Sequence, residues 1–141
     1  MQKLVIANSG AGAQGKTSSV KEVFNLLSTK YPNTILIGGA DIKATIQIGD
    51  VLIGLESQGD PYSRMFDSLD DFVNMGCDII VCACRTWGAT KEKVSSLQHQ
   101  GYQIIWAQND RTEESSLYRA LHTLYAEHVV QMIEQRIAGK L

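Results

Sequence analysis

The stretch that decides the fold covers residues 3–17 and reads Lys-Leu-Val-Ile-Ala-Asn-Ser-Gly-Ala-Gly-Ala-Gln-Gly-Lys-Thr. Its first part, Lys3–Asn8, is a nearly continuous apolar run, which is typical of a strand buried on both faces. A glycine-rich turn follows, and apolar side chains then recur at helical spacing, which predicts a helix over 17–29. The stretch therefore predicts a strand, a tight turn and a helix in direct succession.

Short apolar runs and helical patterns alternate along the rest of the chain. The patterns predict further strands at 34–38, 78–84 and 102–107, and a hairpin at 44–55 that turns at Gly49-Asp50. They predict helices at 65–73 with a stop at Gly76, from a Thr90 cap to Gly101, and from Thr112 onward. This alternation favours an α/β fold whose mostly parallel sheet is covered by helices on both faces, with the hairpin as its one antiparallel insertion.

Length and composition restrict the class of protein. The chain has 141 residues, of which 44% are hydrophobic and 20% charged, so we expect one folded domain over 1–141 and no disorder. With a net charge of -2, the chain has no excess of positive charge that would attract nucleic acid or an acidic membrane. No apolar run approaches a membrane span of ~18 residues. We therefore expect a soluble, cytoplasmic protein, and the cysteines at 77, 82 and 84 fit reduced core thiols better than a disulfide or zinc site.

Residues 10–17 satisfy the pattern G-x-x-x-x-G-K-[ST], between the predicted strand and the predicted helix. A polyphosphate needs several backbone N–H groups converging on its oxygens, which a curled glycine-rich loop supplies. In this context the segment resembles the phosphate-binding loop of the P-loop NTPase superfamily. The resemblance implies that the backbone cradle comprises Gly10, Gly12, Ala13, Gln14 and Gly15, that Lys16 bridges the β- and γ-phosphates, that Thr17 holds Mg²⁺, and that Ser18 meets the α-phosphate.

A second acidic group is expected in that superfamily at the end of a neighbouring strand. The run 51–56 has the hydrophobic-then-acid form of a Walker B element, with Glu56 at the usual aspartate position. The segment Glu56–Gly59 also resembles the D-x-x-G of switch regions, in which the glycine N–H meets the γ-phosphate. Glu56 is therefore a candidate catalytic and metal-binding residue and Gly59 a nucleotide contact, although a surface glutamate entering a turn gives the same pattern.

Three further residues follow predicted strands and are candidates for the same site. Asp41 follows the run 35–40 and is either an acceptor-side acid, as in small P-loop kinases, or an ordinary turn residue. Arg85 is a candidate cis arginine finger and Arg111 a candidate contact to the base. The alternative for each arginine, and for Arg64, is a solvated loop side chain. Trp87 fits base stacking and a partner contact equally, and Asp78 is excluded because it begins its strand.

The resemblance also bears on the nucleotide. GTP-specific members carry Asn-Lys-x-Asp where this chain has Ala-Gln-Asn-Asp at 107–110, so we expect ATP rather than GTP. The size of the chain and a short lid at 85–91 favour hydrolysis of ATP·Mg²⁺ or transfer of its γ-phosphate to a small acceptor. The alternative is a GTPase-like binding module in which the 57–66 loop controls a protein partner. The sequence does not identify the acceptor or the partner.

Overall fold

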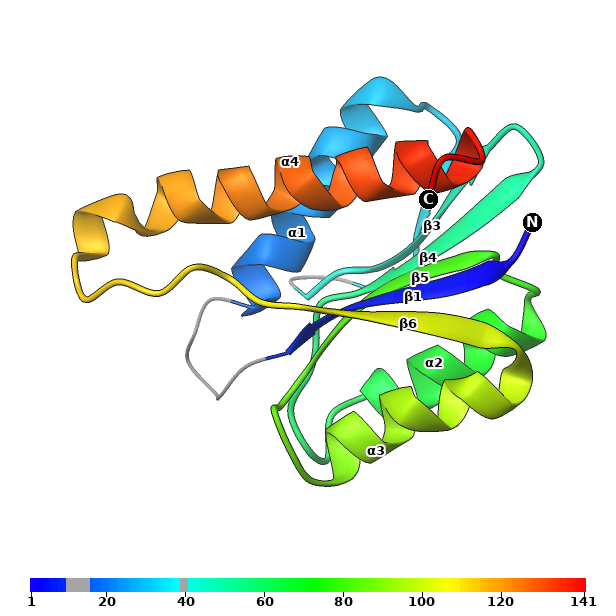
Figure 1. Cartoon of the computed structure of the whole chain (residues 1–141), viewed down its shortest axis with the longest axis horizontal. Coiled ribbons are helices and arrows are strands. Elements are labelled where there is room, and N and C mark those ends of the chain that lie inside the picture. Colours follow the sequence, from blue (N-terminus) through cyan, green and yellow to red (C-terminus); the bar gives the residue numbers. More distant parts are fainter. Residues whose placement is uncertain (10–15, 39–40) are drawn as a thin grey trace.

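In the part of the chain that the structure describes, six strands form one sheet in the order β2-β3-β4-β5-β1-β6 (Figure 1). The computed structural model describes residues 1–9, 16–38 and 41–141, and the side chains of Lys16 and Thr17 lie outside the description. The strands are β1 (Lys3–Ser9), β2 (Thr34–Leu36), β3 (Lys43–Ile48), β4 (Val51–Glu56), β5 (Ile79–Cys84) and β6 (Tyr102–Ala107). The helices are α1 (Lys16–Lys30), α2 (Met65–Asn74), α3 (Ala89–Ser96) and α4 (Tyr118–Ile137), with short 3-10 turns η1 (Leu97–Gln100) and η2 (Ser115–Leu117).

Five of these strands run in the same direction. β1 pairs in parallel with β5 and β6, and β4 pairs in parallel with β5. β3 is antiparallel to both β2 and β4, so β2 again runs with the others. The carboxyl ends of β1, β2, β4, β5 and β6 therefore lie along one side of the sheet, which we call the carboxyl edge. The expected α/β fold and the hairpin turning at Gly49 are confirmed, and Gly49 has the positive φ of 57° that such a turn requires.

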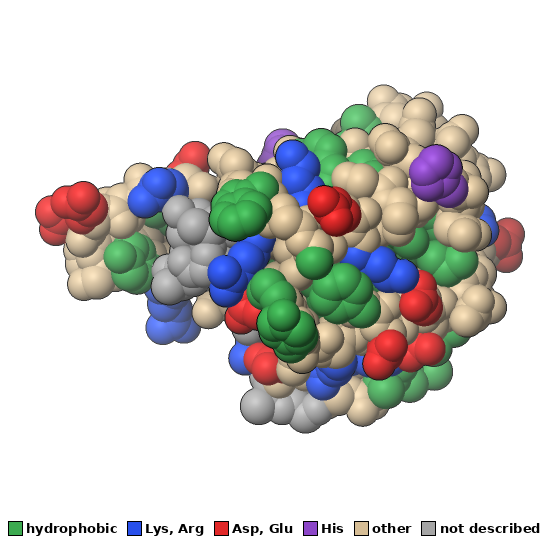
Figure 2. All heavy atoms as spheres, turned by 90° about the horizontal axis from the view of Figure 1, so that it is seen from below, with side chains coloured by type: hydrophobic (Ala, Val, Ile, Leu, Met, Phe, Trp, Pro, Cys, Tyr) green, Lys and Arg blue, Asp and Glu red, His purple; other side chains and the backbone are tan. Residues whose placement is uncertain are grey.

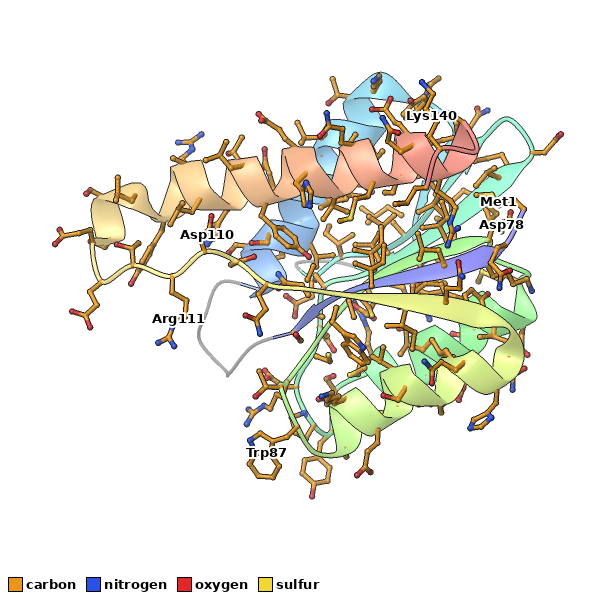
Figure 3. The ribbon with its side chains drawn as sticks, viewed as in Figure 1. Met1, Asp78, Trp87, Asp110, Arg111 and Lys140 are labelled. Atoms are coloured by element: carbon orange, nitrogen blue, oxygen red, sulfur yellow. The ribbon has the colours of Figure 1, made fainter. Side chains whose placement is uncertain are left out.

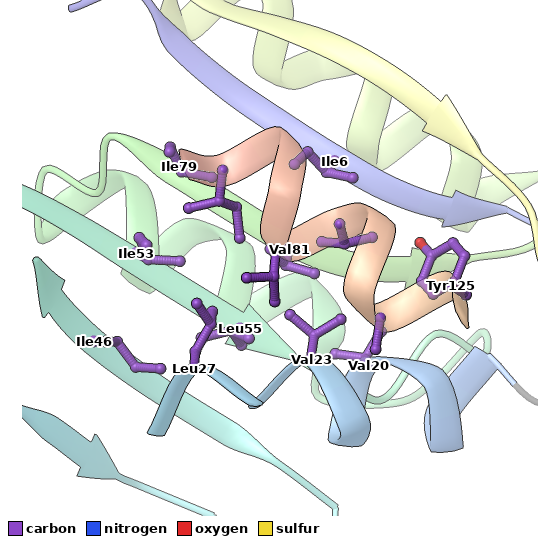
Figure 4. Packing of buried hydrophobic residues seen from close by; sticks show 14 of the residues in the cluster. Ile6, Val20, Val23, Leu27, Ile46, Ile53, Leu55, Ile79, Val81 and Tyr125 are labelled. Atoms are coloured by element: carbon purple, nitrogen blue, oxygen red, sulfur yellow. The ribbon is translucent and has the colours of Figure 1, made fainter. Parts of the chain in front are cut away.

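Helices cover both faces of the sheet, in three layers (Figure 1). On one face, α1 and α4 pack on apolar side chains of the strands, such as Ile6, Ile53 and Val81 (Figure 4). On the other face, α2 and α3 cover a second core that contains Phe72 and all three cysteines. The cysteines form no disulfide in the described part of the chain and are buried, and burial raises the pKa of the Cys77 thiol to about 12.

Two local expectations are wrong. The last helix begins at Tyr118 rather than at Thr112, because Thr112 accepts a hydrogen bond from the Glu114 N–H and so closes a local turn. Thr90 does not cap α3, whose N-cap is Gly88 with a φ of 90°. The buried Thr90 hydroxyl instead accepts the Arg85 N–H at 2.9 Å, which closes the loop between β5 and α3.

A polar contact joins α1 to α4 at the helix ends remote from the carboxyl edge. Glu134 accepts hydrogen bonds from the Lys30 ammonium and, at 2.7 Å, from the Tyr31 hydroxyl. These bonds, that of Lys30 first, lower the pKa of Glu134 below its ordinary value. A lowered folded-state pKa stabilises the protein above the unfolded pKa, and this stability is lost as the pH falls through the lowered value.

We therefore expect Glu134→Gln to reduce the pH dependence of stability in acid. Between about pH 7 and about pH 3 the wild type should lose more of its free energy of unfolding than the variant does, because only the wild type has this carboxylate to protonate. Urea unfolding, monitored by circular dichroism at several pH values, measures the free energy of unfolding of both proteins. Parallel pH profiles for the two proteins would contradict this role of Glu134.

Candidate functional site

The segment 10–15, which carries the glycine-rich part of the motif, lies outside the described residues. The residues on either side are described: β1 ends at Ser9, and the 15-residue helix α1 begins at Lys16. The motif is therefore bounded by a strand end at the carboxyl edge and by a helix N-terminus. Asp110, Arg111 and Trp87 lie at this end of the molecule, whereas Asp78 lies at the opposite end (Figure 3). There Asp78 accepts the Leu52 N–H at 2.9 Å.

Glu56 is the most constrained of the candidate residues. It ends β4, its side chain has no exposed surface, and its carboxylate accepts bonds from two groups of Arg64, Nε at 2.7 Å and Nη2 at 3.1 Å. The Ser68 hydroxyl and the Gln58 N–H, at 3.1 Å, also donate to it. The hydrogen bond to Glu56 raises the pKa of Arg64 above its ordinary value. This carboxylate is therefore fully used in holding the 57–64 loop and the start of α2.

Asp41 is brought to the same cluster from the far side of the hairpin. Its carboxylate lies 3.6 Å from the Lys21 ammonium of α1 and accepts the Gln58 side-chain amide at 3.0 Å. Its backbone carbonyl accepts Arg64 Nη2 at 2.7 Å. Arg64 thus joins two candidate acids that are 15 positions apart in the sequence, Asp41 and Glu56.

β4 does not lie beside β1, because β5 is inserted between them. The chain crosses the end of β5 after leaving β4, and buried Gly59 makes this possible. A Cβ at position 59 would lie 2.7 Å from the backbone of Ala83, so no side chain fits. The 57–64 loop is therefore pressed against the end of β5, in the direction of β1.

The segment after β5 meets this loop through an ion pair. Arg85 Nη2 lies 3.3 Å from Asp60 Oδ1, and both side chains are well exposed. An exposed pair of this kind contributes little stability and separates easily, so Arg85 is able to turn toward another anion. Trp87 is 80% exposed and Tyr62 fully exposed, and Tyr62 has a φ of 64°, a strained value for a residue with a side chain.

A second polar cluster lies at the ends of β1 and β6. Asn8, which is fully buried, donates to Asn109 at 2.9 Å, and Asn109 donates to the hydroxyl of Ser19 on α1 at 2.7 Å. Among the residues that the structure describes, the Oδ1 atom of Asn8 has no hydrogen-bond partner. This cluster ties the first turns of α1 to the segment that continues to the exposed Asp110 and Arg111.

Four further residues belong to these clusters and were not expected there from the sequence: Gln58, Ser68, Asn8 and Asn109. Ser68 carried a usable signal, because it lies on the apolar stripe of α2 beside Met65, Leu69 and Phe72. A polar residue on such a stripe indicates a buried partner, here Glu56. Asn8 and Asn109 gave no such signal, since their pairing depends on β6 lying next to β1.

Comparisons with protein-family models, curated proteins and solved structures gave no match. In the described part of the chain, no three His, Cys, Asp or Glu side chains are grouped so as to hold a metal ion. The described helices also include none with the length and apolar character needed to cross a membrane. The chemistry of the site must therefore be argued from its own residues.

Proposed function

We propose that this protein binds ATP with Mg²⁺ through residues 10–18 and hydrolyses it or transfers its γ-phosphate to a small acceptor. The observation that carries the proposal is the position of the G-x-x-x-x-G-K-[ST] match. It falls between the carboxyl end of a central strand, β1, and the N-terminus of a long helix, α1. The partial positive charge of a helix N-terminus and the N–H groups of its first turn favour a phosphate at this place.

The charged groups along the carboxyl edge support the second half of the proposal. Within the described residues, exposed Arg85 forms its ion pair with exposed Asp60, so it is available to neutralise charge on a transferring phosphoryl group. Asp41, half-exposed beside Lys21, suits the acceptor side. Bound Mg²⁺ would neutralise phosphate charge beside the Thr17 hydroxyl. Glu56 does not fit as a direct ligand, because its oxygens already accept bonds from Arg64, Ser68 and Gln58; we assign it the positioning of the 57–64 loop.

A second candidate function is a nucleotide-dependent switch. It is favoured by Tyr62 and Trp87, two exposed aromatic side chains on the two loops that the Asp60–Arg85 pair joins. Aromatic side chains are enriched among the residues that dominate protein interfaces. Slow hydrolysis with partner affinity that depends on the nucleotide would favour this function, and phosphorylation of a small molecule would favour the first.

Lys16→Ala tests nucleotide binding. The variant should bind ATP·Mg²⁺ at least tenfold more weakly, which corresponds to about 1.4 kcal/mol, because it loses the one side-chain cation of the motif. Calorimetric titration of both proteins with ATP and with GTP gives the dissociation constants, and we expect no preference for GTP. Lys140→Ala is the matched control, since Lys140 is exposed at the opposite end of the molecule (Figure 3). Equal affinities in wild type and Lys16→Ala would exclude the phosphate-loop assignment.

A further inference from the structure

The outermost strand on the hairpin side of the sheet exposes three consecutive apolar residues. Ile35, Leu36 and Ile37 are 65%, 54% and 49% exposed. They belong to β2 and its continuation, and among the described strands β2 pairs only with β3. An edge strand is ordinarily protected by charged side chains, prolines or a covering element. The segment 33–38, Asn-Thr-Ile-Leu-Ile-Gly, contains neither a charged residue nor a proline.

The backbone N–H and carbonyl of Leu36 in β2 point away from β3, toward the outside of the sheet. The Gln47 N–H donates to the Asn33 carbonyl and the Ile37 N–H to the Lys43 carbonyl, so positions 33 and 37 bond toward β3. Because bonded positions alternate along an antiparallel strand, Ile35 also bonds toward β3, and Leu36 presents its N–H and carbonyl outward. Gly38 again donates to Lys43, which ends the free edge. Leu36 is thus the centre of a short open edge.

We propose that β2 pairs with β2 of a second copy of this chain, antiparallel, with Leu36 opposite its own counterpart. In that arrangement the N–H and carbonyl of each Leu36 bond to those of the other, which is the self-complementary contact that a two-fold axis requires. Each Ile35 then lies beside an Ile37 of the other copy. The sheet continues through the dimer axis, and both open edges at β2 are closed.

Charge favours a second copy over a different partner. In a two-fold dimer, a charged side chain near the axis faces the same side chain of the other copy and repels it. An acidic or basic partner, by contrast, would be recognised by side chains of the opposite charge on this edge. The segments 33–38 and 44–49, which carry β2 and most of β3, contain no charged residue, and Lys43 at the start of β3 is paired with Asp71 of α2. A groove of about 370 Å³ beside Ile35, lined by Thr45, Gln47 and Leu52, adds an uncharged surface on the same edge.

The opposite edge strand, β6, is protected. The Lys91 ammonium lies 5.4 Å from the centre of the Trp106 ring, and Arg136 donates to the side chain of Gln103. These two cations belong to α3 and α4 and lie beside the edge strand, and charge next to an edge opposes pairing with another copy. The contrast assigns the dimer contact to β2. Since the open edge is short, we expect an interface below about 1,200 Å² and a weak dimer, with a dissociation constant of the order of 100 µM.

Sedimentation equilibrium over about 5 µM to 1 mM tests the dimer. The wild type should show a monomer–dimer equilibrium, and Leu36→Lys should be monomeric throughout, because two lysines would meet at the axis. Leu124→Lys is the matched control: Leu124 is 57% exposed, on α4, and its variant should dimerise as the wild type does. A monomeric wild type at the highest concentration, or equal loss in both variants, would overturn the proposal.

A cysteine cross-link tests the register. Paired residues in an antiparallel ladder have Cα atoms about 5.5 Å apart, within the range that a disulfide spans. Leu36→Cys should therefore form a covalent dimer under mild oxidation, whereas Leu124→Cys should not. The native cysteines are fully buried and leave the background low. Cross-linking of both variants to the same extent, or of neither, would contradict this pairing.

Discussion

Glu56→Gln should lower the free energy of unfolding by about 2–4 kcal/mol, because it leaves the Arg64 guanidinium without its counter-charge in a largely closed site. Glu56 has no exposed surface, and its carboxylate accepts bonds from Arg64, Ser68 and Gln58. Glutamine keeps the shape but offers one acceptor oxygen and places an amide against the arginine. Urea unfolding of both proteins measures the difference. Asp60→Asn is the control, since its pair with Arg85 is exposed and should change stability little.

The same variant separates two roles of Glu56 in turnover. The hypothesis of a catalytic carboxylate predicts ~100-fold slower ATP hydrolysis by the folded variant, with nucleotide affinity within a fewfold. A positioning role predicts that Arg64→Met, which breaks the same pair from its other side, slows hydrolysis as much. The double variant should then be no slower than either single one. A large loss of turnover in Glu56→Gln but not in Arg64→Met would support a catalytic role of the Glu56 carboxylate. An unchanged free energy of unfolding in Glu56→Gln would contradict a stabilising role of the Glu56–Arg64 pair.

Gly59→Val should also be strongly destabilising, by about 2–3 kcal/mol, because its side chain would need space that the backbone of Ala83 occupies. The loop cannot lift from β5 without loosening the Gln58 contacts to Glu56 and Asp41. We therefore expect weaker acceptor phosphorylation in addition to lower stability. Thermal unfolding and turnover of the variant, each corrected for the folded fraction, measure the two effects.

Gly49→Asn is the control for this substitution. Gly49 has a positive φ of 57°, but a Cβ there meets nothing within 4 Å. Asparagine tolerates this conformation, so the variant should lose only a few tenths of a kcal/mol. If Gly59→Val were as mild as Gly49→Asn, the close contact between the loop and β5 would not be needed for folding.

Much of the fold could be predicted because its signals are local. The apolar run at 3–8, the hairpin turn at Gly49-Asp50 and the stop at Gly76 each depend on a few neighbouring residues, and each is found where expected. The start of α4 was not predicted, because Thr112 can cap a helix or close a turn equally well. Local hydrogen-bonding capacity does not distinguish these outcomes.

The candidate site was predictable only in part, for a topological reason. The sequence indicates which residues follow strands, but the order of the strands decides which of them meet. The catalytic role expected for Glu56 depended on the 51–55 strand lying beside the first strand, and this condition is not met, since β5 separates them. The pairing of Glu56 with Arg64 was missed for a different reason: Glu56 was expected to bind Mg²⁺ and Arg64 to be a solvated loop arginine, and an ion pair of this kind leaves no periodic pattern in the sequence.

The position of β1 has a consequence for the order of folding. β1 is the earliest strand in the sequence, yet its two neighbours are β5 and β6, and Lys3 finds its partner only at Tyr102. The β3–β4 hairpin closes a short loop and is able to form soon after its residues leave the ribosome. β1 must wait until most of the chain has been synthesised, and the long loop that it closes costs conformational entropy before any contact compensates for it. The central strand of the sheet therefore reaches its final place late, and an incomplete chain lacks both neighbours of β1.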